Sequence, residues 1–381
     1  MASSSSSSSN SAPFCLVKSS INVDETFDVP HIVAPGETLS STGLTSRPGG
    51  KGANVSAAIA LAGAPVRFSG AVGSDAPWPL DELACRGVDI DGVETLKDQP
   101  TGRAFIQIAA DGENSIVLLK GANYATSSST SDPETVFSSA PRLITHLVVH
   151  NEIPLAVTTA FLEYAQRTRS GGQAPRITSI FNPSPMPTPD ELRSFPWSAI
   201  DVLIVNEGEG SELLNALDAR GADAVPSDLV QGSDERSRRV VDALADLEAL
   251  KHTAWIVLTR GSRGVMARIQ VAPAASPAQR TFFSLPSPKP RQVRDTTGAG
   301  DTFAGNLVAA LMGVNLSESA ARNADGDDVE SATQQASAAA KSDDHVNRVL
   351  TWACMAASVA CETVGAMRSI PKAEDVKARL A

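Results

Sequence analysis

The sequence is poor in residues arranged to form a disulfide framework or a metal centre. Its four cysteines are far apart and include no CxxC pair: Cys15, Cys85, Cys354 and Cys361. This usage is typical of separate thiols in a reducing compartment. The five histidines include no HExxH spacing, so the sequence predicts no histidine-bound metal.

Basic charge and long apolar runs are also scarce. Lys and Arg number 32 against 43 Asp and Glu, which gives a net charge of −11. Because an acidic surface is repelled by nucleic acid and by anionic membranes, neither is predicted as a partner. No apolar run is long enough to cross a bilayer. Residues 1–13 are mostly serine and lack the basic and apolar segments of a signal peptide, so we expect a disordered tail and a cytosolic location, with a nuclear one also allowed.

What the chain does contain is a regular alternation of short apolar runs and helical patterns over most of its 381 residues. Five runs have no polar alternation and therefore predict strands that are buried on both faces: 67–73, 146–151, 177–182, 201–206 and 255–261. Apolar residues at helical spacing predict helices over 154–169, 209–219 and 235–251. This order favours one α/β domain over residues 14–381, with ligands bound beyond the carboxyl ends of parallel strands.

Two regions depart from that alternation. Residues 102–120 form a predicted β-hairpin around Asp111-Gly112, and with an extended stretch near 21–46 they predict a small separate sheet, a lid built from about 21–48 and 101–121. Residues 317–344 are rich in Ala, Ser, Asp and Gln, which is typical of a flexible insertion between two helices.

The first chemical motif runs from Asp295 to Gly305, with Gly298-Ala299-Gly300-Asp301 directly before an apolar helical run. Small residues at a helix start leave backbone N–H groups open to an anion, and the helix dipole adds to the attraction. An aspartate there repels phosphate, but it is well suited to accept a proton from a hydroxyl that attacks phosphate. The alternative is an ordinary glycine-rich helix start whose aspartate acts as a cap.

The second motif is Gly49-Gly50-Lys51-Gly52-Ala53-Asn54 at the start of another helical run. It is not a P-loop, because Gly52 stands where that motif requires Ser or Thr. Paired glycines allow a close approach of backbone to ligand, and Lys51 and Asn54 supply hydrogen-bond donors suited to sugar hydroxyls. Taken alone, such a segment is more often an ordinary turn.

Together the two motifs resemble the two signatures of the ribokinase family of carbohydrate kinases, of the phosphofructokinase B type. Further segments resemble that family in the same order: Ser20–Asp24, Gly112–Asn114, Gly121–Asn123, Asn151-Glu152, Asn182–Pro185, Asn206–Glu209 and Thr259–Gly264. The resemblance implies a three-layer α/β/α fold with a mainly parallel central sheet and a small β-sheet lid.

The resemblance also implies a role for each motif residue. Asp301 would be the catalytic base, and the N–H groups of Gly298, Ala299 and Gly300 would form an anion hole. The sugar would be held by Asn22, Asp24, Gly50, Lys51, Asn54 and Glu152. The ATP would lie along Asn206, Thr259, Gly261 and Gly300, with Glu209 placing Mg²⁺ through water. A potassium ion would be bound by Asp295, Thr297, Ala360, Gly365 and Ser369.

The sugar residues favour D-ribose, phosphorylated on its 5-hydroxyl, and the family resemblance implies a homodimer formed through the lid. Another small substrate, such as fructose, deoxyribose or a nucleoside, is one alternative, and a catalytically inactive regulator that binds sugar or nucleotide is another. An NAD-dependent enzyme is disfavoured because no GxGxxG follows the first strand. Ser19 stands where the family usually has glycine, so either its side chain crowds the floor of the sugar site or the local alignment is off by one residue.

Overall fold

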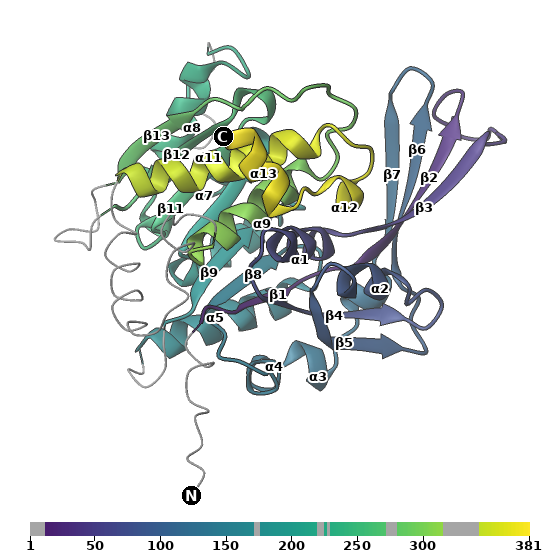
Figure 1. The fold of residues 1–381 in the computed structure, drawn as a ribbon, viewed down its shortest axis with the longest axis horizontal. Coiled ribbons are helices and arrows are strands. Elements are labelled where there is room, and N and C mark those ends of the chain that lie inside the picture. The colour runs from purple at the N-terminus through teal and green to yellow at the C-terminus, as the bar shows by residue number, and fades with distance from the viewer. Residues whose placement is uncertain (1–11, 171–175, 219–224, 227–228, 272–279, 315–342) are drawn as a thin grey trace, which may run out of the picture.

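The computed structural model describes residues 12–170, 176–218, 225–226, 229–271, 280–314 and 343–381, and it is built on a nine-stranded sheet (Figure 1). The strand order is β13-β12-β11-β10-β9-β8-β1-β4-β5, and every neighbouring pair is parallel except β11–β12 and β12–β13. The five strands expected from the sequence are β4 (Val66–Gly73), β8 (His146–His150), β9 (Thr178–Asn182), β10 (Val202–Asn206) and β11 (Trp255–Thr259). The others are β1 (Cys15–Lys18), β5 (Asp89–Leu96), β12 (Val265–Ile269) and β13 (Thr281–Leu285). The predicted mainly parallel sheet is confirmed.

Helices cover both faces of this sheet, which gives the expected three layers. One apolar core contains side chains of α1 (Lys51–Leu61), α9 (Ala299–Leu311) and α11 (Asp343–Ala360). The core on the other face contains side chains of α5 (Leu155–Ser170), α7 (Glu207–Leu217) and α8 (Asp234–Asp246). Shorter helices complete the layers: α2 (Pro79–Ala84), α3 (Ser128–Ser131), α4 (Pro133–Ser138), α6 (Pro189–Ser194), α12 (Ala366–Ser369) and α13 (Ala373–Leu380).

The predicted helix boundaries are less accurate than the predicted strands. α7 begins two residues before the expected position 209, and the expected end at 219 lies outside the described residues. The helix expected over 235–251 ends at Asp246, because Leu247 takes an extended conformation with ψ 130°. A separate 3₁₀ turn, Glu248–Leu250, then buries Leu250 completely.

A second, four-stranded sheet protrudes from the body of the molecule (Figure 1). We call it the lid sheet; its order is β3 (Gly43–Gly49), β2 (Asn22–Val29), β6 (Gly102–Ala109) and β7 (Asn114–Leu119). β6 and β7 form the expected hairpin, whose turn contains Gly112 at φ 91°. Most of the predicted tail (1–11) and of the predicted insertion (317–342) lies outside the described residues, whereas Asp343 and Asp344 belong to the first turn of α11.

The strand order also locates a ligand site. β1 lies between β8 and β4, so the chain leaves it toward β4 and β5 on one side and later builds β8 to β11 on the other. The connections therefore diverge at the carboxyl end of β1, and such a switch point opens a crevice in which α/β proteins bind ligands. The segments that follow β1 and β8 carry the predicted residues Asn22 and Glu152.

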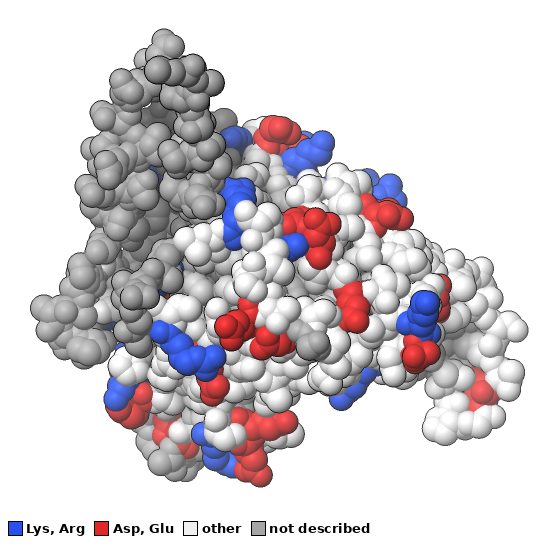
Figure 2. Space-filling view, turned by 90° about the horizontal axis from the view of Figure 1, so that it is seen from below, with Lys and Arg blue, Asp and Glu red and all other residues white. Residues whose placement is uncertain are grey.

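Charge is distributed rather than gathered on the face shown in Figure 2, where acidic and basic side chains are interspersed among uncharged ones. Some ion pairs of the described chain join side chains one helical turn apart, such as Arg239 with Glu235 at 3.0 Å. Within the described ranges, no helix is both long and apolar enough to span a membrane.

Candidate functional site

The start of α9 presents open backbone donors. Gly298 takes a left-handed conformation, φ 77°, and closes a turn in which the Ala299 N–H donates to the carbonyl oxygen of Thr296 at 3.2 Å. The N–H groups of Gly298, Gly300 and Asp301 have no acceptor among the described residues. The contribution of the Ala299 N–H to the anion hole stays a prediction, because in this structure that N–H closes the turn. The Asp301 N–H is open beside those of Gly298 and Gly300.

Asp301 is held by the second glycine motif. The Asn54 side-chain amide donates to Asp301 Oδ2 at 2.8 Å, a bond that joins the first turns of α1 and α9. The two helices approach closely because Gly305 has no side chain: a Cβ there would lie 2.4 Å from Cβ of Ala58. Asp301 Oδ1 has no hydrogen bond within the described chain, so one oxygen of the carboxylate is fixed and the other is available to accept a proton.

Glu152, just beyond β8, contacts the same motif. Its Oε2 accepts the Lys51 N–H at 2.9 Å and also the hydroxyl of Ser20. Burial alone would lower the pKa of the Lys51 ammonium, but nearby carboxylates, foremost that of Asp301, raise it above its ordinary value. Lys51 thus remains charged among carboxylates and supplies a fixed positive charge for an incoming anion.

Asp24 on β2 faces the same group of carboxylates. Burial, followed by the charges of Glu152 and Asp301, raises the pKa of Asp24 to about 7. Its carboxylate lies against the backbone of Gly49, where a Cβ would come within 2.1 Å of Oδ2. The next residue, Gly50, has φ 88° and packs on the backbone of Asn22, so the paired glycines allow the lid strands to meet the start of α1.

A cavity of about 110 Å³ lies beside Lys51 and Asp301 at the carboxyl ends of the strands. Of the predicted residues, six line it: Lys51, Asn206, Glu209, Thr259, Gly300 and Asp301. Two polar residues of its lining were not assigned a role from sequence, His150 at the end of β8 and Asn182 at the end of β9. Their position as the last residue of a buried strand was the available signal. Asn182 donates to the carbonyl oxygen of Ile204 at 2.8 Å and contacts Glu209 Oε2 at 3.4 Å.

The residues predicted for the nucleotide follow β10 and β11. Asn206 and Glu209 form a capping box at the start of α7: the Asn206 Oδ1 accepts the Glu209 N–H, and Glu209 Oε2 accepts the Asn206 N–H, both at 2.9 Å. Thr259 ends β11 and lines the cavity. Gly261 begins the next 3₁₀ turn at φ 56° and does not line the cavity.

Two of the residues predicted for a monovalent cation, Thr297 and Gly365, contact a third, Asp295. Its Oδ1 accepts the Thr297 N–H at 2.9 Å and its Oδ2 accepts the Gly365 N–H at 2.8 Å, so it joins two segments that are far apart in the chain. Partial burial opposes its charge, but these hydrogen bonds and the charge of Arg47 hold the pKa of Asp295 below its usual value. Ser369 is buried and donates to the carbonyl oxygen of Ala366 at 2.9 Å.

Ser19 is not among the residues that line the cavity, and the prediction that it crowds the floor of the sugar site stays a prediction. Its side chain is completely buried, bonds to His150 Nδ1 at 3.0 Å, and packs against Gly52, where a Cβ would lie 2.4 Å from that of Ser19. Burial, and then the charge of Lys51, lower the pKa of His150 to about 3, so the imidazole is neutral near pH 7. Ser19 thus packs beneath the site and lets the neutral imidazole line it.

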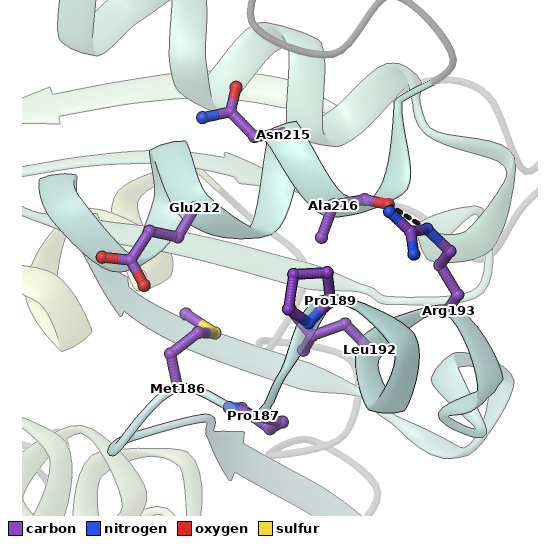
Figure 3. Close-up of a pocket in the computed structure, with 8 residues that line it drawn as sticks. All are labelled: Met186, Pro187, Pro189, Leu192, Arg193, Glu212, Asn215 and Ala216. Atoms are coloured by element: carbon purple, nitrogen blue, oxygen red, sulfur yellow. Dashed lines mark hydrogen bonds between the residues drawn. The ribbon is translucent and has the colours of Figure 1, made fainter.

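A larger hollow of about 260 Å³ lies between α6 and α7, and Figure 3 shows its lining. Arg193 closes one end by donating to the carbonyl oxygen of Ala216 at 3.2 Å, and much of the wall is formed by Met186, Pro187 and Pro189. None of the residues predicted to act chemically lines this hollow. The smaller cavity at Asp301 is therefore the candidate active site.

Comparison with known proteins gives the family. The family model described as pfkB family carbohydrate kinase matches residues 14–342. This chain belongs to the pfkB family of carbohydrate kinases. Among solved structures, it is similar to the ribokinase of Cryptococcus neoformans var. grubii serotype A in complex with ADP, at 40% identity and a TM-score of 0.74, with 97% of this chain and 100% of that chain covered. The predicted ribokinase-like fold is thereby confirmed.

Curated relatives of this pfkB-family chain have lower identity. The ribokinase of Haemophilus influenzae is 31% identical over 303 residues, covering 78% of this chain and 84% of the relative. A bifunctional ribokinase/ribose-5-phosphate isomerase A of Fructilactobacillus sanfranciscensis is 28% identical over 372 residues, and there the match spans 55% of the relative's length.

Proposed function

We propose that this pfkB-family kinase transfers the γ-phosphoryl group of ATP to the 5-hydroxyl of D-ribose, giving D-ribose 5-phosphate and ADP. The observation that carries the proposal is the pairing of Asp301 with open N–H groups at the start of α9, inside a cavity that also contains Lys51. The similarity to proteins named ribokinase supports ribose as the sugar.

The reaction follows from this geometry. The 5-hydroxyl oxygen attacks the γ-phosphorus, its proton passes to Asp301 Oδ1, and the bond from phosphorus to the oxygen of the leaving ADP breaks. Asn54 keeps Asp301 in place by bonding the other carboxylate oxygen. The N–H groups of Gly298, Gly300 and Asp301, together with the Lys51 ammonium, stabilise the negative charge on the phosphoryl oxygens.

The predicted metal ions suit the residues present. Glu209 uses Oε2 in its capping box and keeps Oε1 available, which fits an ion held mainly by phosphates and water, as Mg²⁺ usually is. When bound, Mg²⁺ would neutralise phosphate charge. The predicted potassium site offers oxygen donors, the carboxylate of Asp295 with the hydroxyl or carbonyl groups of Thr297, Ala360, Gly365 and Ser369, and oxygen suits hard cations.

The substrate is tested by measuring ADP release from ATP and Mg²⁺ with a panel of sugars and nucleosides, with and without K⁺. Ribose-dependent turnover that K⁺ stimulates is the expected result. Turnover with fructose, 2-deoxyribose or a nucleoside instead would keep the mechanism and reject ribose. Binding of ATP or sugar without any turnover would favour the inactive regulator.

The raised pKa of Asp24 predicts an acidic limit to activity. Ionised Asp24 accepts sugar hydroxyls, so kcat/KM for the sugar should fall roughly tenfold per pH unit below about 7 as the carboxylate takes up a proton. The stability contribution of Asp24 has the opposite pH dependence. Because its folded-state pKa is above the unfolded value, this contribution is fully present below the unfolded pKa and is lost as pH rises through 7. Asp24→Asn should therefore weaken sugar binding yet raise the melting temperature at pH 8, and not at pH 4.

Asp28→Asn is the matched control, because Asp28 lies on the same strand and is exposed. It should change neither the pH profile nor the melting temperature. An unaltered acidic limb in Asp24→Asn would show that another group sets it.

We further propose that the kinase dimerises through the lid sheet. Its edge strand β7 exposes a run of apolar side chains, with Val117 63% and Leu118 54% exposed, and Leu44 on β3 is 58% exposed. Light scattering at assay concentration should give a molar mass twice that of one chain. The Val117→Lys variant should have the mass of a single chain. A monomeric parent protein would reject the dimer.

We also propose a cytosolic location, in agreement with the exposed free thiol of Cys85, which suits a reducing compartment. Microscopy of the tagged protein tests this: an additional nuclear signal is compatible with the proposal, and a secreted protein would reject it.

A further inference from the structure

A buried asparagine at the exit of the lid has no role in the mechanism above. Asn123 belongs to the 3₁₀ turn Gly121–Tyr124 that follows β7, and its side chain is only 7% exposed. It lies beside Ile21 and Asn22, where the chain passes from β1 into the lid strand β2. All hydrogen bonds of this buried side-chain amide go to Ile21 and Asn22, so Asn123 constrains the conformation of that short segment.

The hydrogen bonds define which way both amides point. The Ile21 N–H can only donate, and it bonds to the Asn123 side chain at 2.9 Å, so the atom facing it is Oδ1. Asn123 Nδ2 then donates to the Ile21 carbonyl oxygen at 3.0 Å and to Asn22 Oδ1 at 2.7 Å. The Oδ1 of Asn22 is therefore occupied, and its Nδ2 has no partner among the residues that the structure describes.

Asn22 and Asp24 are two apart on β2, so their side chains are on the same face of the lid sheet. That face is the one from which Asp24 interacts with Glu152 and Asp301. The two neighbouring side chains thus have opposite hydrogen-bonding roles: the free Nδ2 of Asn22 can donate hydrogen bonds, and an ionised Asp24 can only accept them.

The lid strand β6 closes directly on this pair. Gly102 pairs with Asn22 across the lid sheet, and a Cβ on Gly102 would lie 2.1 Å from Asn123 Nδ2 and 2.4 Å from Asn22 Oδ1. The absence of a side chain at 102 lets the two amides bond beneath the strand. The start of β2, the start of β6 and the 3₁₀ turn after β7 therefore meet at the hydrogen bond between Asn123 Nδ2 and Asn22 Oδ1.

We propose that Asn123 is a positioning residue that fixes Asn22 as a hydrogen-bond donor toward the sugar, and so sets the hydroxyl pattern that the site accepts. The inference rests on the proposed sugar kinase activity and deepens it. The preferred substrate carries, opposite Asn22 and Asp24, a hydroxyl whose oxygen accepts from the amide and whose proton is donated to the carboxylate. A sugar that lacks this hydroxyl leaves both groups unpaired.

The test is Asn123→Asp, which keeps the shape of the side chain and its acceptor for the Ile21 N–H but removes both donors. Asn22 must then rotate its amide to donate to the new carboxylate, and it presents Oδ1 to the sugar. We expect KM for ribose to rise roughly 10- to 100-fold, in line with a lost and mispaired buried hydrogen bond, while kcat changes less than about threefold. The ratio of kcat/KM for ribose to that for its 2-deoxy or 3-deoxy analogue should shrink by a similar factor.

Asn22→Asp provides an independent arm, because it leaves every Asn123 bond intact yet replaces the free donor by an acceptor. It should give the same rise in KM and the same loss of discrimination, and it carries the test if Asn123→Asp does not fold. Asn215→Asp, an exposed change of the same kind on α7, should leave all parameters unchanged.

The outcomes separate the two claims. If the parent enzyme phosphorylates a sugar but a folded Asn123→Asp keeps its KM and its deoxy-sugar discrimination, the role of Asn123 is wrong and the proposed function stands. Equal losses in kcat for every sugar would also reject it, since they indicate general disruption. A parent enzyme without sugar-dependent turnover would reject the proposed function, and the inference with it.

Discussion

Replacing Asp301 by asparagine should abolish nearly all turnover while leaving substrate binding intact. Asparagine has the same shape and can still accept the 2.8 Å bond from Asn54, but it cannot take up the proton of the attacking hydroxyl. Loss of a positioned general base costs about 10²- to 10⁴-fold in rate, so we expect kcat to fall about 10³-fold. Coupled ADP release measures kcat, and calorimetric titration with sugar and ATP measures binding.

The binding measurement distinguishes a lost catalytic group from a damaged fold or site. A variant that loses both kcat and binding has lost its fold or its site, whereas loss of kcat alone assigns proton transfer to Asp301. Asp190→Asn is a suitable control, because its carboxylate is 94% exposed on α6 and should not affect turnover. If Asp301→Asn retained more than about a tenth of the parent kcat, another group would have to be the base.

The central sheet could be predicted because the amino-acid composition of several of its strands already indicates that they are buried. Runs such as Val202–Asn206 and Trp255–Thr259 are apolar on both faces, and only a strand covered by helices on each side has that pattern. β1 was missed although it is an interior strand of the sheet, between β8 and β4. It has only four residues, and its last, Lys18, is a charged side chain buried to 4% exposure.

The candidate functional residues that belong to local sequence motifs could also be predicted from the sequence. Asp301 and Asn54 belong to two glycine-containing helix starts, and the structure joins them by a direct hydrogen bond over 247 positions of sequence. The donors at the start of α9 were less accessible. Which N–H group is open depends on the turn that Gly298 makes, and that turn uses the N–H of Ala299.

Residues whose role depends on the fold alone were not accessible. His150 is the last residue of β8, whose middle residues are apolar. Only the pairing of β8 with β1 brings His150 next to Ser19 and the cavity. Asn123 is 101 positions away from the Asn22 side chain that it orients. No pattern of periodicity or spacing connects two such residues, because their contact is created by the return of the lid hairpin to the body.

Gly298→Ala should strongly reduce turnover. Residue 298 needs φ 77°, which costs an L-residue about 1 kcal/mol or more. The added Cβ would also lie 2.8 Å from both the Cα and the Cβ of Ala366, so the turn must move away from α12. Because that turn aims the open N–H groups, we expect kcat to fall about 10²-fold, the loss typical of one misplaced anion-hole donor.

Gly313→Ala separates the causes of that loss. Gly313 follows the other end of α9 at a similar φ, 82°, but a Cβ there meets nothing within 4 Å. Both variants should lower the melting temperature through backbone strain, Gly298→Ala by more because of the added crowding, and only Gly298→Ala should lose activity. A Gly298→Ala enzyme that melts lower but keeps its kcat would show that the turn supports the fold without presenting the donors to phosphate, and the stabilising charge would then have to come from Lys51.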